Sequence, residues 1–198
     1  WCTLANQLLT LRAWRKDGHE GERIPLLAYT SIVTEIMWFL ASIGIAIEVL
    51  VFVLPWSLGL TDSIDPQFTR VLFWFTGHPI VYFWLLPIYV SWYMMLPKQA
   101  GGKLYSDGLT RMVFIMFLLL IPVGVHHQFT DPGIAFSSKT IQWLLTFGIF
   151  FPSIVTLFSV VAGLEMGARA NGGTGKLMWI KKLPWDNPVV SGQLLAGL

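Results

Sequence analysis

The sequence predicts an all-α fold, a polytopic bundle of transmembrane helices, and two observations lead to this prediction. Of the 198 residues, 55% are hydrophobic and only 12% are charged, whereas soluble domains carry about 25% charged residues. The charges are also gathered in short connecting segments, which leaves long apolar runs between them. This distribution is typical of membrane-spanning helices and not of a large soluble core.

Four apolar runs reach the roughly 20 residues that a helix needs to cross the hydrocarbon core of a membrane. They cover residues 27–56, 69–96, 109–129 and 139–167, and another begins at 188–198. We treat residues 1–198 as one membrane domain. Because the chain lacks a starting methionine and stops just as an apolar run begins, we expect it to be a piece of a longer protein.

The positive charges give the predicted helices a direction, since Lys and Arg collect on the cytoplasmic side of a membrane. Eleven of the 13 Lys and Arg residues lie in or beside the connections 12–26, 97–108 and 168–187. Only Arg70 and Lys139 border the opposite connections. We therefore expect the first three connections to be cytoplasmic, with the second run passing inward and the third outward.

Composition also excludes some classes of function. The net charge of +2 gives no indication of nucleic-acid binding. A single cysteine, Cys2, permits neither a disulfide nor a thiolate metal site within the chain. The chemistry must therefore come from other polar side chains.

Three of the four histidines lie inside the apolar runs, where polar groups are costly and therefore point to function. His78 lies about ten residues from the outer end of the second run. His126 and His127 lie near the outer end of the third, so all three have a similar depth. A lone helical histidine is more often a satisfied core residue, but three at one depth predict a metal site.

Neutral imidazole is the usual ligand of copper, zinc and iron. Adjacent residues of a helix point about 100° apart, so His126 and His127 can bracket one ion while His78 supplies a third ligand. Three imidazoles without a nearby carboxylate or thiolate favour copper or zinc. An open fourth position would be where chemistry occurs.

A stripe of hydroxyl groups continues inward from His78. Tyr82, Tyr89 and Tyr93 follow it at offsets of 4, 11 and 15 residues, which places all of them within about 60° on one helix face. Three residues of the fourth run extend toward the same side: Ser153, Thr156 and Ser159. Hydroxyls can pass protons through a dry region, but tyrosines also pack and Ser and Thr often bond their own backbone. Both interpretations stay open on these grounds.

Two segments about fifty residues apart resemble subunit I of the haem–copper oxygen reductases. They are residues 74–82, WFTGHPIVY, and residues 125–129, VHHQF. The likeness extends over essentially the whole chain, and the runs 72–87, 96–103 and 184–188 are most similar to the B-type (ba-type) branch. The resemblance implies a fragment of a core of twelve or more helices.

By this resemblance His78, His126 and His127 match the three ligands of the copper in the binuclear centre. Tyr82 matches the tyrosine that is covalently joined to the first of them and that supplies an electron and a proton when the oxygen–oxygen bond breaks. One helical turn separates it from His78, which suits such a link. Five residues match the single proton-uptake route of the B-type branch: Tyr89, Tyr93, Ser153, Thr156 and Ser159.

The resemblance implies a haem as well, but its iron ligands in that family lie on helices before and after this region. Haem iron is commonly held by histidine. The remaining histidine, His19, lies in a charged inner connection, where a solvated role is expected. We therefore expect this chain to carry copper ligands and haem-contacting surface and no haem axial ligand.

The resemblance implies the catalytic subunit of a terminal respiratory oxidase in a prokaryotic plasma membrane. Such a subunit reduces oxygen to water with electrons from cytochrome c, received through a copper-bearing subunit II, and couples this to proton translocation. The A-type branch has a glutamate where this chain has Ile80, so a second proton route is not expected.

Two alternatives stay open. The first is a nitric oxide reductase of the same superfamily, which generally lacks the tyrosine at position 82 and uses iron in place of copper; Tyr82 favours oxygen reduction. The second is a histidine-based metal or proton transporter. Such a protein tends to carry carboxylates at a midplane site, and the histidine region has none.

Overall fold

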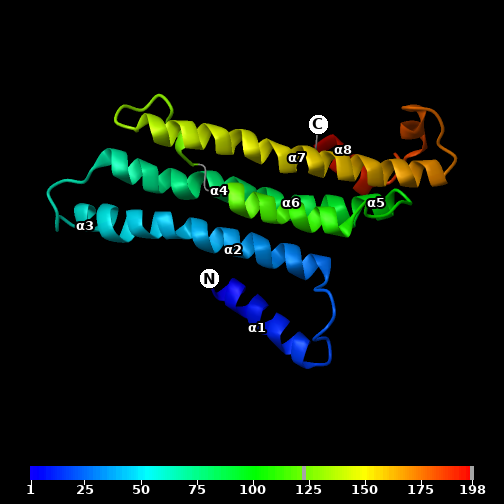
Figure 1. Cartoon of the computed structure of the whole chain (residues 1–198), viewed down its shortest axis with the longest axis horizontal. Coiled ribbons are helices and arrows are strands. Elements are labelled where there is room, and N and C mark those ends of the chain that lie inside the picture. The colour runs from blue at the N-terminus through cyan, green and yellow to red at the C-terminus, as the bar shows by residue number, and fades with distance from the viewer. Residues whose placement is uncertain (122–123, 197–198) are drawn as a thin grey trace.

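The computed structural model describes residues 1–121 and 124–196, and every regular element in these ranges is a helix (Figure 1). In chain order the elements are α1 (Cys2–Lys16), α2 (Leu26–Ile47), η1 (Glu48–Val53), α3 (Leu54–Ser57), α4 (Pro66–Met94), α5 (Leu96–Gln99), α6 (Asp107–Leu120), η2 (Gly124–Gln128), α7 (Phe136–Ala170), η3 (Met178–Lys182) and α8 (Pro188–Ala196). The all-α prediction is confirmed.

Local chemistry sets the starts of two central helices. The Asp65 carboxylate accepts hydrogen bonds from the backbone N–H groups of Gln67 and Phe68, at 2.9 and 3.1 Å, and Pro66 occupies the first position of α4, where no N–H is needed. Ser106 caps α6 by accepting from the Leu109 N–H at 3.2 Å. These caps supply partners for the free donors of each first turn.

The long helices α2, α4, α6 and α7 run side by side and alternate in direction (Figure 1). Three segments among the described residues are long and apolar enough to cross a membrane: Leu26–Ser57, Pro66–Gln99 and Phe136–Ala170. The connections that we expect to be cytoplasmic all lie at one end of the bundle, on the right of Figure 1. The boundaries of the membrane spans themselves stay a prediction.

The predicted run 109–129 differs from the others. Its α-helix, α6, ends at Leu120, and η2 follows as a 3₁₀ helix from Gly124. Residues 122–123 lie outside the described part of the chain. A helix usually ends at or before the residue that precedes a proline, and Pro122 follows Ile121 in the sequence. Helix α6 has 14 residues and is therefore about 21 Å long, which is shorter than the roughly 30 Å hydrocarbon core of a membrane.

Close contact between α2 and α4 fixes the helix that carries His78. A Cβ on Gly44 of α2 would lie 2.8 Å from the Leu72 carbonyl oxygen of α4, so only glycine permits this approach. Nearby, the Thr76 hydroxyl donates to the Ala41 carbonyl at 2.6 Å and accepts from the Ile45 N–H at 2.9 Å. Small residues and shared hydroxyl bonds are the means by which helices associate in membranes.

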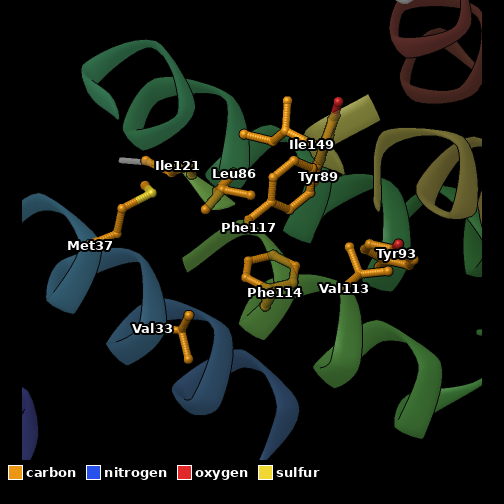
Figure 2. Packing of buried hydrophobic residues seen from close by; sticks show 10 residues of the cluster. All are labelled: Val33, Met37, Leu86, Tyr89, Tyr93, Val113, Phe114, Phe117, Ile121 and Ile149. Carbon is orange, nitrogen blue, oxygen red and sulfur yellow. The ribbon is translucent and has the colours of Figure 1, made fainter. Parts of the chain in front are cut away.

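The main core lies between these helices (Figure 2). Phe114 and Phe117 of α6 are fully buried and pack beside Leu86 of α4. Tyr89 and Tyr93 belong to this same core, and their rings lie against the α6 side chains (Figure 2). The inward stripe of tyrosines is therefore enclosed by α4, α6 and α7.

Candidate metal centre

His78 lies in the middle of α4 and is buried. Pro79 follows it without ending the helix, as transmembrane helices tolerate when neighbouring groups satisfy the freed carbonyl. The Nε2 atom of His78 is buried and has no hydrogen-bond partner among the described residues. A buried polar atom without a partner is costly, so this nitrogen requires a bonding partner beyond the hydrogen bonds described.

The other two histidines come from η2, which packs against α4. The α-helical geometry predicted for them is wrong in detail, because η2 is a 3₁₀ helix, in which adjacent residues are about 120° apart. Gly124 opens this turn. A Cβ there would lie 2.0 Å from the Trp74 carbonyl oxygen, so the turn reaches α4 only because position 124 carries no side chain.

The three predicted ligands meet. One ring nitrogen from each of His78, His126 and His127 lies within 4.8 Å of the others. The Nδ1 of His78 is 3.2 Å from the Nε2 of His127, and the His78 and His126 rings are 4.2 Å apart between centroids. Two nitrogens that bind one ion at about 2.0 Å each can be at most about 4 Å apart. The pair at 3.2 Å meets this condition, and the all-imidazole donor set suits copper.

Trp74 covers one side of this cluster. Its ring stacks on that of His127, with 3.9 Å between centroids and 15° between planes. Within the described residues His78 is buried, His126 half-buried and His127 exposed. The cluster therefore has one open side, and the Trp74 ring covers the face of His127 on which it stacks.

Tyr82 lies one turn inward of His78, and the two ring centroids are 5.0 Å apart. The Tyr82 ring also contacts Phe117 of α6, at 5.6 Å between centroids. The phenol is thus held between the metal ligands and the core. This places the candidate redox tyrosine beside the His78 ring.

The inner part of the stripe connects α4 to α7. The Tyr93 hydroxyl donates to Thr156 Oγ1 at 2.9 Å and also lies within reach of Ser159, while Tyr89 lies within reach of Ser153. The described contacts include no hydrogen bond between Tyr82 and Tyr89; both rings pack on Phe117 instead.

The three α7 hydroxyls also bond their own backbone. Ser153, Thr156 and Ser159 donate to the carbonyls four residues earlier, at 3.4, 2.9 and 2.8 Å. A hydroxyl that donates to its own backbone can still accept from a tyrosine. The contacts are therefore compatible both with a proton route and with a purely structural role for these residues.

The fourth histidine, His19, does not belong to this cluster and contacts other residues. His19 stacks on Trp14, with 4.7 Å between ring centroids, and its Nδ1 lies 2.9 Å from a Glu22 carboxylate oxygen. These contacts belong to the connection between α1 and α2.

Two features of the centre were missed from the sequence: the stack of Trp74 on His127 and the close approach at Gly124. Trp74 stands four residues before His78, and this spacing places both on one helix face. The spacing could therefore have indicated that Trp74 lies beside the metal ligands. Gly124 gave none, since its role depends on the backbone of another helix.

Residues 1–181 match the family described as "Cytochrome C and Quinol oxidase polypeptide I". The chain is 50% identical to cytochrome c oxidase subunit 1 of Thermus thermophilus, over 98% of this chain and 35% of that protein. It is 28% identical to quinol oxidase subunit 1 of Sulfolobus acidocaldarius, over 89% of this chain and 31% of that protein. It is also 28% identical to cytochrome c oxidase subunit 1 of Bacillus subtilis, over 78% of this chain and 26% of that protein.

The chain thus spans between about a quarter and a third of the length of these relatives. Its apolar helices and its relatives identify it as part of an integral membrane protein. The haem–copper oxidase subunit of Aeropyrum pernix, 23% identical over 82% of this chain and 20% of that protein, also matches. The chain belongs to the cytochrome c and quinol oxidase polypeptide I family.

Proposed function

We propose that the protein containing this chain is the catalytic subunit of a terminal respiratory oxidase. It takes electrons from cytochrome c through a copper-bearing subunit II, reduces oxygen to water and translocates protons across a prokaryotic plasma membrane. The observation that carries the proposal is the convergence of His78, His126 and His127, with Tyr82 one turn away. The 50% identity to the Thermus cytochrome c oxidase subunit supports cytochrome c as the donor.

We assign His78, His126 and His127 to copper. When bound, the copper and a haem iron supply the redox chemistry of oxygen reduction at this place. All four histidines are accounted for by the copper cluster and the His19 contacts, so histidine ligands to the haem iron would come from outside residues 1–198. The open side of the cluster at His127 is where we place the haem contacts.

Tyr82 is proposed as the redox-active acid. Its hydroxyl can give up a proton and its ring an electron beside the His78 ring. We further propose that the two rings are covalently joined, since the His78 Nε2 is buried without a partner among the described residues. Such a carbon–nitrogen bond replaces one ring C–H and the imidazole N–H, and the two electrons and two protons pass to oxygen. Mass spectrometry of the linked peptide would show the loss of two hydrogen atoms.

Protons are proposed to enter from the cytoplasmic side by way of Tyr93, Thr156 and Tyr89, with Ser153 and Ser159 as neighbours. The Tyr93–Thr156 hydrogen bond supports this route. The break between Tyr89 and Tyr82 would be crossed by bound water or by tyrosine rotation. Ile80 provides no carboxyl group for a second route, in keeping with the B-type branch.

The direct test uses the complete complex, purified with its lipid. Oxygen consumption is measured with reduced cytochrome c, with a quinol, and with nitric oxide in place of oxygen. We expect rapid oxygen uptake with cytochrome c. Nitric oxide turnover without oxygen turnover would contradict the proposal, and activity with quinol alone would overturn the assigned donor.

A further inference from the structure

A buried amide and a carboxylate follow directly after the two histidines of η2. Gln128 is fully buried, with 0% of its surface exposed. Its Nε2 donates to an Asp131 carboxylate oxygen at 3.3 Å, and the Asp131 N–H donates to the Gln128 carbonyl at 3.0 Å. Two bonds thus close a tight turn that begins at the residue next to His127.

This turn is attached to the helix that carries His78. Arg70 of α4 pairs with the same carboxylate oxygen of Asp131, at 3.1 Å. Arg70 and His78 are eight residues apart on one helix, about 12 Å along its axis. The ion pair therefore fixes the turn that carries His126 and His127 against the helix that supplies the third nitrogen.

A second cation attaches the turn to α7. Lys139 Nζ donates to the Phe129 carbonyl at 2.6 Å and to the Asp131 carbonyl at 3.2 Å. Arg70 and Lys139 are the two basic residues on the side opposite the other eleven. Both bind the short segment 129–131, so each is used within a few residues of the metal ligands.

We propose that Gln128 and Asp131, held by Arg70 and Lys139, are positioning residues of the metal centre. The inference rests on the proposed copper site. Metal ligands need placement within about 0.5 Å, and η2 is a 3₁₀ turn of only 5 residues. The Arg70 side chain is 57% exposed, so its ion pair adds little to overall stability. The ion pair acts instead on the position of the turn. A variant that loses it should therefore change the metal site without changing the stability of the protein.

Asp131→Asn in the complete oxidase complex tests the assignment. Two properties are measured: the infrared band of carbon monoxide bound at the three-histidine copper, and the rate at which a chelator removes that copper. The matched control is Asp62→Asn, an exposed outer carboxylate. We expect the band to shift or broaden and the chelator to remove the copper about 10–100-fold faster, as follows if affinity falls by the amount usual for outer partners of metal ligands. Haem spectrum and thermal unfolding should match the control.

A second pair of variants keeps the test decisive if Asp131→Asn does not assemble. Arg70→Gln should reproduce the altered band, and Arg70→Lys, which keeps the positive charge, should stay near wild type. An unchanged band and unchanged copper retention in Arg70→Gln or Asp131→Asn would overturn the inference. A wild-type complex with no copper at the three histidines would contradict the proposed function itself, and the positioning role with it.

Discussion

The Tyr93 hydroxyl donates to Thr156 Oγ1 across 2.9 Å, and this hydrogen bond joins α4 to α7 inside the core. Thr156 in turn donates to the Pro152 carbonyl at 2.9 Å. To pass a proton from the threonine onward, its hydroxyl must turn away from its own backbone. The hydrogen bond therefore links two helices and is also a step of the proposed proton route that a single substitution can test.

Thr156→Val removes this acceptor with little change in volume. We expect proton uptake from the cytoplasmic side to slow by about 10-fold, since a lost hydrogen bond at a buried hydroxyl costs on the order of 1–3 kcal/mol. Uptake is followed by a pH indicator during turnover. Thr146→Val is the control, because the Thr146 hydroxyl lies on the same helix and donates to the carbonyl four residues earlier, that of Gln142, at 2.7 Å, as Thr156 does to that of Pro152. Equal rates in both variants would remove Thr156 from the route.

Tyr82→Phe keeps the ring that packs on Phe117 and removes the hydroxyl. Turnover should fall by at least about 10²-fold, the lower range for loss of a positioned acid, while copper remains bound. Oxygen uptake and copper content are measured together. Tyr105→Phe, at an exposed tyrosine whose ring meets Phe158, should leave both unchanged. Near-normal oxygen uptake in Tyr82→Phe would refute its catalytic role.

Gly124→Ala tests the close approach of η2 to α4. The added methyl would meet the Trp74 carbonyl oxygen at 2.0 Å, and backbone cannot move aside as a flexible side chain can. We expect a loss of about 3 kcal/mol, the upper range for overpacking, together with loss of copper. Gly192→Ala, where nothing lies within 4 Å, is the matched control in thermal unfolding. Equal midpoints for the two variants would show that η2 does not pack as described.

Asp107 gives a pH-dependent prediction at the cytoplasmic end of α6. Hydrogen bonds from Arg111 hold the pKa of its carboxyl below the usual value, and Arg23 adds to this. A lowered folded-state pKa stabilises the fold above the unfolded pKa of about 3.9 and loses this effect as pH falls through the folded value. Because the side chain is 34% exposed, solvent screening limits the contribution to about 1 kcal/mol or less.

The unfolding midpoints of wild type and Asp107→Asn should therefore differ at pH 7 and converge in acid. Thermal unfolding in detergent at a series of pH values measures this. Glu20→Gln, at an exposed carboxylate in the connection between α1 and α2, is measured in parallel as the control. A difference that grows as pH falls would contradict the sign of the Asp107 effect.

The sequence sufficed for the helical fold because a bilayer demands long apolar runs and expels charge to the ends. It also indicated the histidine cluster, since His78, His126 and His127 share one depth. It could not indicate that η2 is a 3₁₀ helix, because the path of a short turn depends on which backbone it meets, here that of Trp74. Nor could it pair Asp131 with Arg70: the two are remote in sequence, and charge counting placed them only on the same side.

The metal at the three histidines is the central claim, and X-ray absorption spectroscopy of the purified complete complex tests it most directly. Copper is measured in wild type and in His126→Ala, with the copper of subunit II quantified from its own electron paramagnetic resonance signal. We predict one copper with imidazole nitrogen ligands beyond that of subunit II, and its loss in the variant. Iron in its place, or copper that is unchanged by His126→Ala, would contradict the account.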